Sequence, residues 1–269
     1  MGNKRLSSAE ELEELRKGIL SKRDPNKLIV SICTMSTCGQ TRGSVEVYEK
    51  FKEEIRKAAL EDKVEIEGTG CQGFCEREPV ILIFPEGICY LNVKLEDVPE
   101  IVSRTLAKGE VIERLVYEDP VTGERIAKES EIPFYKNQMR IIFGNNRYIN
   151  PRDIDDYIAL GGYSALSQAL FPMTPEQVLE EIKKSNLRGR GGGGFPTGIK
   201  WETTRNAPGE AKYVIVNCDE GDPGAYMDRS LTEGNPHAVL EGLVIGAYAM
   251  GSHEGFIYVR QEYPIAYDP

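Results

Sequence analysis

Four cysteines in two close pairs constrain this chain more than any other feature of its sequence. Cys33 and Cys38 form a C-x4-C pair, and Cys71 and Cys75 form a C-x3-C pair in a glycine-rich segment. Each pair comes where a predicted strand gives way to a loop, so the fold can bring two distant pairs to one point. Soft thiolate sulfur stabilises iron, and four ligands in two pairs match the two irons of a [2Fe–2S] centre. The spacing therefore predicts an iron–sulfur cluster.

A structural zinc site held by the same four cysteines is the alternative, and the C-x3-C spacing does not exclude it. No histidine precedes His237. A Rieske centre, or a zinc site of two cysteines and two histidines, would therefore lack the ligands it needs in this region. Cys89 and Cys218 have no partner at ligand spacing, and we expect both to be small buried hydrophobic side chains.

The composition is that of a soluble globular protein with two domains. The chain has 269 residues, of which 40% are apolar and 28% charged, and its formal net charge is −10. A negative net charge opposes binding to the phosphate backbone of nucleic acid or to an anionic membrane. We therefore expect no nucleic-acid partner.

No segment has the pattern of a secretory signal or a membrane span. Charged residues interrupt the stretch from Met1 to Lys17, unlike the apolar run of a signal peptide. The apolar segment from Ala238 to Met250 contains Glu241 and is shorter than the roughly 20 residues that cross a bilayer. We expect a cytoplasmic protein without direct membrane insertion, whose cysteines serve metal or redox chemistry rather than disulfides.

Residues 1–108 show the pattern of a small mixed sheet covered by helices. Helices are expected over residues 8–24, 45–59 and 95–106, and strands over residues 28–33, 64–66, 80–84 and 88–93. This order favours an α/β fold, namely a thioredoxin-like domain over residues 1–108. Residues 109–150 are expected to form a linker and lead-in segment.

The second half, residues 151–269, contains the strand, helix, strand order of a parallel sheet. Thr174 and Gln177 form a capping box that starts a helix ending near Lys184. A strand is expected over residues 213–217, a helix over 236–250 and a second strand over 255–259. A crossover from strand to strand through a helix implies that the two strands are parallel.

A glycine-rich segment from Asn186 to Trp201 is the most unusual part of the second half. It contains G-x-G-x-x-G at Gly189, Gly191 and Gly194, but it follows a predicted helix, whereas a dinucleotide-binding fingerprint follows a strand. Glycines let successive N–H groups turn towards one point and bind a phosphate or a flat ring. Positive charge is supplied by Arg188, Arg190 and Lys200. A flexible linker is the alternative, although linkers are not usually interleaved with Arg, Phe, Pro and Trp.

Polar side chains follow the strand predicted over residues 213–217. Asn217, Asp219, Glu220 and Asp222 stand at its carboxyl end, where ligands collect in parallel sheets. Their oxygens can accept hydrogen bonds from ribityl or ribose hydroxyls and from the edge of an isoalloxazine or nicotinamide ring. A calcium loop is the alternative, because Ca²⁺ uses the same oxygen ligands.

The cysteine spacing on this α/β pattern resembles the thioredoxin-like [2Fe–2S] ferredoxins over residues 26–108. These proteins occur alone and as the 24-kDa-type subunit of complex I. In that family the cluster passes on single electrons, so the resemblance implies a one-electron relay held by the four cysteines.

The glycine-rich segment and the acidic strand end together resemble the flavin (51-kDa-type) subunit of complex I and its soluble relatives. Those relatives are diaphorase subunits of NAD-linked or electron-bifurcating [FeFe] hydrogenases and of formate dehydrogenases, and the similarity runs from Pro133 to Arg260. It implies an incomplete Rossmann-like FMN-binding domain over residues 151–269. The FMN contacts implied are Gly189, Arg190, Gly192, Lys200, Asn217, Asp219 and Glu220.

The same resemblance implies an NAD(H) site beside the flavin. Phe195 would stack on the nicotinamide ring. Asp222 stands where the complex I pattern has a glutamate that contacts NADH. The implied partners are iron–sulfur subunits, namely a 24-kDa-type [2Fe–2S] subunit and the catalytic subunit of a hydrogenase or formate dehydrogenase.

Electrons would then pass from NAD(P)H through FMN to iron–sulfur clusters. Members of this family continue beyond the part that this chain resembles, through a ubiquitin-like domain and a helical domain that binds a [4Fe–4S] cluster. The ligands of that cluster and a later flavin loop do not occur here, so we expect a truncated flavin site. The alternative function is an electron-carrier or docking module that uses only the [2Fe–2S] cluster, without bound flavin.

Overall fold

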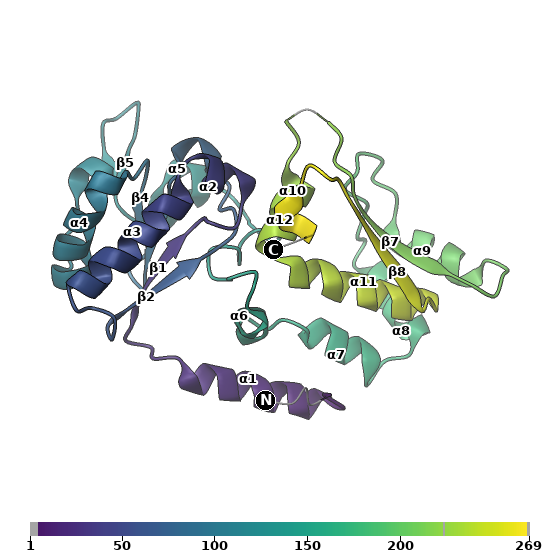
Figure 1. Ribbon diagram of the computed structural model, residues 1–269. Coiled ribbons are helices and arrows are strands. Elements are labelled where there is room, and N and C mark those ends of the chain that lie inside the picture. The colour runs from purple at the N-terminus through teal and green to yellow at the C-terminus, as the bar shows by residue number, and fades with distance from the viewer. Residues whose placement is uncertain (1–4, 223, 268–269) are drawn as a thin grey trace. The chain divides into compact units, whose positions relative to one another are not determined.

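The computed structural model describes residues 5–222 and 224–267, which form two compact units (Figure 1). The four-stranded unit consists of the described residues of Arg23–Asp156, Tyr226–Pro236 and Pro264–Pro269. The two-stranded unit consists of those of Met1–Lys22, Tyr157–Ala225 and His237–Tyr263. Each unit is thus assembled from segments that are distant in sequence. The domain boundaries predicted above stay a prediction.

The four-stranded unit is built on a mixed sheet with the strand order β2-β1-β3-β4. Strand β1 pairs in parallel with β2, and antiparallel pairs join β1 to β3 and β3 to β4. Between β1 and β2 the chain forms helices α2 and α3, as a parallel pair requires a crossover. The bounds are β1 Leu28–Ile32, α2 Thr37–Thr41, α3 Ser44–Lys57, β2 Val64–Gly68, β3 Ile81–Phe84 and β4 Ile88–Tyr90.

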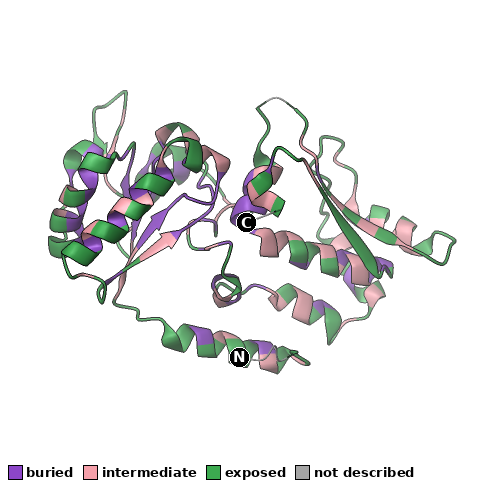
Figure 2. Cartoon of the chain, viewed as in Figure 1, coloured by how far each residue is buried: buried purple, intermediate pink, exposed green. Residues whose placement is uncertain are grey.

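Both faces of this sheet are buried, because successive side chains of a strand point to opposite faces. Ile81 and Ile83 join one apolar cluster, while Leu82 joins another. Phe51 of α3 and Ile101 cover the first face, and both are fully buried. Figure 2 shows buried residues along the strands of this unit and on one side of α3. The helix expected over residues 95–106 consists of three successive segments of different helix type. They are the 3₁₀ turn η2 Leu95–Asp97, the α-helical turn α4 Val98–Glu100 and the π-helix η3 Ile101–Leu106.

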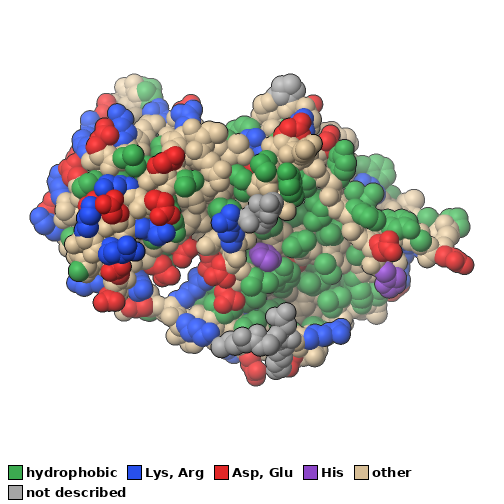
Figure 3. Space-filling model, in the orientation of Figure 1, with side chains coloured by type: hydrophobic (Ala, Val, Ile, Leu, Met, Phe, Trp, Pro, Cys, Tyr) green, Lys and Arg blue, Asp and Glu red, His purple; other side chains and the backbone are tan. Residues whose placement is uncertain are grey.

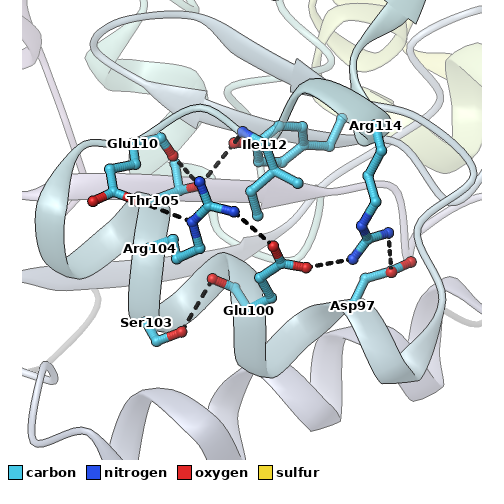
Figure 4. Close-up of polar contacts among 9 residues, drawn as sticks. Asp97, Glu100, Ser103, Arg104, Thr105, Glu110, Ile112 and Arg114 are labelled. Carbon is cyan, nitrogen blue, oxygen red and sulfur yellow. Dashed lines mark hydrogen bonds and ion pairs between the residues drawn. The ribbon is translucent and has the colours of Figure 1, made fainter.

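A polar network fastens that helical run to the sheet (Figure 4). The hydroxyl of Tyr90 lies 2.7 Å from the hydroxyl of Thr105 and accepts a hydrogen bond of 3.0 Å from the backbone N–H of Ile112. The buried phenol of Tyr90 therefore has its hydrogen bonds satisfied. At the surface, Arg114 bridges the carboxylates of Asp97 and Glu100 at 2.5 Å each.

Residues 109–150, predicted as a linker and lead-in, cover the second face of the sheet. Ile132 and Tyr135 are buried against it in a cluster with Leu82 and Cys89. The carboxylate of Glu129 is buried as well and is paired with the guanidinium of Arg140 at 2.9 Å. The elements here are η4 Glu113–Leu115, β5 Tyr117–Glu118, β6 Arg125–Ile126, η5 Glu129–Glu131 and α5 Pro133–Lys136.

The two-stranded unit contains the predicted parallel pair. Strand β7 pairs with β8 from Tyr213 opposite Glu254 to Cys218 opposite Val259. The chain passes from β7 to β8 through α10 and α11, and α10 itself belongs to the four-stranded unit. The remaining bounds are α1 Ala9–Lys22, α6 Ile154–Ala159, α7 Ser164–Leu170, α8 Pro175–Lys184, α9 Thr197–Asn206, β7 Tyr213–Cys218, α10 Met227–Gly234, α11 Pro236–Met250, β8 Glu254–Val259 and α12 Pro264–Tyr267.

The charge that interrupts the apolar helix α11 is buried and satisfied. The carboxylate of Glu241 accepts hydrogen bonds from the hydroxyl of Tyr157 and from the backbone N–H groups of Tyr163 and Leu166, at 2.5, 2.8 and 2.9 Å. A buried carboxylate with three donors is stabilised, whereas one without them would be costly. Glu241 therefore joins α11 to the chain around α7.

Apolar side chains gather on the visible face of the two-stranded unit, over α11 (Figure 3). Leu240 and Val244 of α11 are 37% and 42% exposed, and Ile215 of β7 and Tyr258 of β8 are 63% and 60% exposed. A pair of strands alone is marginally stable, and exposed apolar faces of this kind mark surfaces for further protein contacts. No helix in the described ranges is long and apolar enough to cross a membrane.

A half-buried carboxyl in β2 makes stability depend on pH. Burial, and then the nearby carboxylate of Asp156, raise the pKa of Glu67 from 4.5 to about 7. The stabilising contribution of the protonated carboxyl is complete below pH 4.5 and is lost as the pH rises through 7. Glu67→Gln, which keeps the neutral form, should therefore be more stable than the natural chain at pH 8, by about 2 kcal/mol.

Thermal unfolding midpoints of anaerobically prepared protein at pH 5 and pH 8 would measure this effect. Glu86→Gln is the matched control, because Glu86 is exposed in the turn between β3 and β4. Equal gains for both variants at pH 8, or a gain for Glu67→Gln that is the same at pH 5, would contradict the assignment.

Candidate functional site: four converging thiols and a glycine-rich loop

The parallel pairing of β1 and β2 places both cysteine pairs at one edge of the sheet. Cys33 follows the last residue of β1, Ile32, which is paired with Gly68 at the end of β2. The two strand ends stay joined beyond the sheet, since the backbone N–H of Thr69 donates to the carbonyl of Ile32 at 2.8 Å. Cys71 follows Thr69 by two residues. The carboxyl ends of two parallel strands thus bring the distant pairs together.

Each of the four sulfur atoms interacts with another cysteine of the set. The sulfurs of Cys71 and Cys75 are 3.5 Å apart. Hydrogen bonding to the Cys33 thiol, and then to Cys75, lowers the pKa of Cys71 to about 3. Hydrogen bonding to the Cys75 thiol lowers the pKa of Cys38 to about 7, and the pKa values of Cys33 and Cys75 are raised in turn. All four predicted ligands therefore converge, and the pKa values of Cys71 and Cys38 are lowered towards the thiolate, the form that binds metal.

Local backbone geometry holds the first pair. Ser36 caps α2: its hydroxyl accepts the backbone N–H of Gly39 at 3.0 Å and lies 2.9 Å from the sulfur of Cys33. A Cβ on Gly39 would stand 1.9 Å from the carbonyl oxygen of Cys33 and 3.2 Å from its sulfur. Only glycine fits where the chain turns so closely on itself.

The second pair is held by a backbone turn. The N–H of Gly73 donates to the sulfur of Cys71 at 3.3 Å, and Gly73 has φ +94°. Backbone N–H groups aimed at sulfur are a regular feature of iron–sulfur sites. The side-chain amide of Gln72, which is 2% exposed, has no hydrogen-bond partner in the described structure.

These observations fit a cluster better than a set of unrelated thiols. Two pairs of soft ligands, one sulfur already accepting an N–H, are the donor set of a [2Fe–2S] centre. Cys33, Cys38, Cys71 and Cys75 would hold it. Among the described residues, no three or more His, Cys, Asp or Glu side chains are arranged around a position for a single metal ion. The other two cysteines, Cys89 and Cys218, are buried, as predicted.

The buried carboxyl of Glu78 lies near the cysteines. The carboxylate of Glu78 accepts the backbone N–H of Val80 at 2.8 Å, and burial is the main cause that raises its pKa to about 8. The Cys71 thiolate adds to this shift.

The glycine-rich segment is a closed loop between α8 and α9. Arg188 and Pro196 form an isolated antiparallel bridge, and the N–H of Gly189 donates to the carbonyl of Phe195 at 2.9 Å. The guanidinium of Arg188 closes the loop further by donating to the carbonyl of Gly194 at 3.2 Å. The loop therefore follows a helix, as predicted, and Arg188 is used in holding its shape.

The predicted cofactor residues of this loop are accessible. Gly189, Arg190 and Gly192 are exposed, and Gly192 has φ +99°, a conformation that favours glycine. Phe195 is 57% exposed, and Lys200 lies exposed in the first turn of α9. Gly198 has a different role, since a Cβ there would stand 2.6 Å from the side chain of Lys183 in α8.

The acidic strand end is a separate turn after β7. Asn217 is exposed and its side chain accepts the N–H of Asp219 at 3.1 Å. Glu220 has φ +45°, a left-handed conformation that is strained for a residue with a Cβ. Its carbonyl accepts hydrogen bonds of 3.2 Å from both Arg260 and Tyr263.

The predicted metal ligands thus lie together at one point. The predicted flavin residues lie on two separate turns of the two-stranded unit. The first turn lies between α8 and α9 and contains Gly189, Arg190, Gly192 and Phe195. The second turn contains Asn217, Asp219, Glu220 and the exposed Asp222, and residues that follow β8 hold it in place. Their cofactor roles remain predictions. Sequence reasoning missed Arg260 and Tyr263, because no local pattern links them to Glu220.

Comparison with known protein families assigns both regions to a class. The four converging thiols and the loop unit together define an iron–sulfur protein with a flavin-binding segment. Residues 19–106 match the model of the thioredoxin-like [2Fe–2S] ferredoxin family, and residues 182–269 match that of the Nuo51 FMN-binding domain family. The predicted α/β fold class and the predicted [2Fe–2S] and FMN cofactors are confirmed at the level of these families.

Curated relatives match part of the chain. NADP-reducing hydrogenase subunit HndC of Solidesulfovibrio fructosivorans is 51% identical over 131 residues, which are 49% of this chain and 26% of that protein. A subunit of the NADH-quinone oxidoreductase of Rhizobium meliloti (strain 1021) is 49% identical over 113 residues, or 42% of this chain and 27% of that protein. The chain thus spans about a quarter of the length of these relatives.

A solved structure also matches part of the chain. The thioredoxin-like [2Fe–2S] ferredoxin from Aquifex aeolicus is 34% identical, and the match covers 38% of this chain and 99% of that protein with a TM-score of 0.32.

The close turn at Gly39 provides a test of the cluster site. Gly39→Ala places a Cβ against the carbonyl of Cys33 at 1.9 Å, so the loop must open and the Cys33 sulfur must move. We expect this variant to lose most of its iron and sulfide after anaerobic purification. Iron and sulfide analysis, with the visible spectrum, would measure the loss.

Gly18→Ala is the matched control, because a Cβ at Gly18 in α1 meets nothing within 4 Å. This control should keep its full cluster. A fully loaded Gly39→Ala variant would show that the cluster does not lie at these loops.

Proposed function

We propose that this chain passes electrons from NAD(P)H through FMN to iron–sulfur clusters, as a diaphorase-type subunit of a multisubunit oxidoreductase. One observation carries the proposal: four converging thiols and a segment of the FMN-binding family occur in the same chain. A nicotinamide exchanges two electrons at once and a cluster exchanges one, so a flavin between them supplies the step from pairs to single electrons.

The two turns of the flavin segment would bind and orient the cofactors. The exposed glycines leave open space beside the backbone of the loop, and Arg190 and Lys200 add positive charge for a phosphate. Asn217, Asp219 and Glu220 provide oxygens for ribityl hydroxyls and a ring edge. The exposed ring of Phe195 offers a face for stacking on the nicotinamide, with Asp222 as a second NAD(H) contact.

The thiol site would hold the one-electron relay. The Cys71 sulfur accepts the Gly73 N–H, and the buried carboxyl of Glu78, whose pKa is raised by burial, lies near the thiols. These residues fix the ligands and the local charge, which set the reduction potential of such a site.

The more specific assignment is to a hydrogenase or formate dehydrogenase complex. It is supported by the similarity to HndC and to NAD-reducing hydrogenase HoxS subunit alpha of Cupriavidus necator, 53% identical over 100 residues. We propose a 24-kDa-type [2Fe–2S] subunit and a catalytic subunit as partners. We place the complex in the cytoplasm, where thiols remain reduced.

Analysis of FMN, iron, sulfide and zinc in one anaerobic sample, together with bleaching of its visible spectrum by NADH, tests the proposal. Flavin with iron, sulfide and bleaching is the expected result. Iron and sulfide without flavin would instead indicate an electron-carrier or docking module. Zinc alone would overturn the iron–sulfur assignment.

The role of the positive charge at the loop has a separate test. Lys200→Gln should weaken FMN binding by about 1 kcal/mol, roughly fivefold in Kd, because a charge-assisted contact to phosphate is lost. Titration of flavin fluorescence quenching by apoprotein would measure it. Lys184→Gln is the control, since Lys184 is exposed at the end of α8 and paired with Glu181. Equal Kd values for the two variants would remove Lys200 from the site.

A further inference from the structure

Helix α10, Met227–Gly234, belongs to the four-stranded unit, although it comes long after both cysteine pairs in the chain. The ferredoxin family matches residues 19–106, whereas α10 falls within residues 182–269, which the FMN-binding family matches. The end of α10 is buried, yet the two apolar clusters on the faces of the sheet contain none of its side chains. Contacts of another kind must therefore hold α10 in this unit.

Glu233 joins the end of α10 to the first cysteine loop. One carboxylate oxygen accepts the backbone N–H of Thr37 at 3.0 Å, and the other accepts the Thr37 hydroxyl at 2.7 Å. Thr37 is the first residue of α2 and immediately precedes Cys38. Glu233 is 2% exposed, so the hydrogen bonds of its buried carboxyl are costly to break.

Two glycines bring the end of α10 against the second cysteine loop. A Cβ on Gly70, next to Cys71, would stand 2.3 Å from the Cα of Gly234. A Cβ on Gly234 would stand 3.0 Å from the Cα of Gly70. The two backbones are therefore in direct contact, and a side chain at either position would push the helix end and the loop apart.

Asn146 lies beside this glycine contact. It is fully buried, and its side-chain amide donates to the backbone carbonyl of Cys71 at 3.3 Å. A Cβ on Gly234 would stand 2.7 Å from the same amide nitrogen. Asn146 thus touches both the Cys71 loop and the end of α10, which leaves no room for the two to shift against each other.

We propose that Glu233 and Gly234 are positioning residues of the cluster site, which hold the two cysteine loops together and so slow the release of the [2Fe–2S] cluster. Both loops are reached from one helix end: Glu233 bonds the neighbour of Cys38, and Gly234 contacts the neighbour of Cys71. The loops cannot move apart without losing one of these contacts. This inference rests on the proposed [2Fe–2S] site.

A segment of the flavin region thereby completes the cluster site. Residues 19–106, which match the ferredoxin family, contain all four ligands but neither of the two positioning residues. Release of a cluster requires its thiolates to leave the irons, and loops that are fixed at both pairs oppose this movement. Retention of the cluster therefore depends on the folding of a segment that the ferredoxin family does not include.

The test is the rate at which the full chain, purified anaerobically, loses its cluster to an excess of an iron chelator, followed by visible absorbance. Glu233→Ala removes both acceptors for Thr37 and should release the cluster about tenfold faster. Glu233→Gln keeps a carbonyl oxygen for the backbone N–H of Thr37 and an amide that can donate to the Thr37 hydroxyl. Its rate should therefore stay close to the natural one.

Thr232→Val is the matched control in the same helix. The hydroxyl of Thr232 donates to the carbonyl of Asp228 within α10 at 2.8 Å, so its removal should leave the release rate unchanged. Thr37→Val removes one of the two hydrogen bonds to Glu233 from the other side and should speed release about threefold. This variant decides the question if Glu233→Ala does not fold.

The glycine contact has its own pair of variants. Gly234→Ala places a Cβ 3.0 Å from the Cα of Gly70, so it should also speed release about tenfold. Gly242→Ala is the control, because a Cβ at Gly242 in α11 meets nothing within 4 Å.

Hydrogen exchange of the Thr37 amide gives a measurement that needs no cluster. In the iron-free chain this N–H donates to Glu233, so Glu233→Ala should exchange it about tenfold faster, and Thr232→Val should leave it unchanged.

Release rates of Glu233→Ala and Thr37→Val equal to that of Thr232→Val would overturn the positioning role of Glu233. A Glu233→Gln rate as fast as that of Glu233→Ala, or unchanged exchange of the Thr37 amide, would overturn it as well. Equal rates for Gly234→Ala and Gly242→Ala would overturn the role of Gly234. Zinc alone in the natural chain is a different result, which refutes the proposed function itself.

Discussion

The parallel pairing of β1 with β2 is the constraint on which the site depends. It joins Leu28 to Val64 and Ile32 to Gly68, so both strands end at one edge of the sheet. Parallel strands need a crossover, and the chain supplies it with the amphipathic helix α3, whose Phe51 fills the core. A one-residue slip would turn every side chain of β2 to the opposite face and move Cys71 away from Cys33. Apolar burial along the strands therefore also fixes the separation of the thiols.

The second constraint is close approach of backbones around the sulfurs. Gly39 lies against Cys33, and Gly70 lies against Gly234. Side chains at these positions would occupy space that the loops themselves fill. A compact inorganic group needs such tight loops, because its ligands must reach it from several directions while N–H groups remain aimed at sulfur. Helix α10 takes part in these close contacts, and it follows the acidic turn after β7 directly in the chain.

Much of the fold could be predicted from hydrophobic periodicity and turn residues. The strands at Leu28 and Val64, the helix α3 and the capping box at Thr174 appear where expected. The helix expected over residues 95–106 is a series of different turns, in which Thr105 contacts Tyr90 and Asp97 pairs with Arg114. Residues 109–150 have weak periodicity, yet Ile132 and Tyr135 complete the second face of the sheet. Long-range packing of this kind leaves no regular spacing in a sequence.

The sequence by itself determined the ligand chemistry: which cysteines form pairs, which glycines and charges form the loop, and which carboxylates follow a strand. These are local properties, since spacing, charge and backbone freedom are set by neighbours in the chain. Only the tertiary structure decided that Glu233 clamps Thr37, that Gly234 meets Gly70, and that Arg260 and Tyr263 hold the turn at Glu220. Such contacts join residues many positions apart, and they arise from the packing of whole elements rather than from any local pattern.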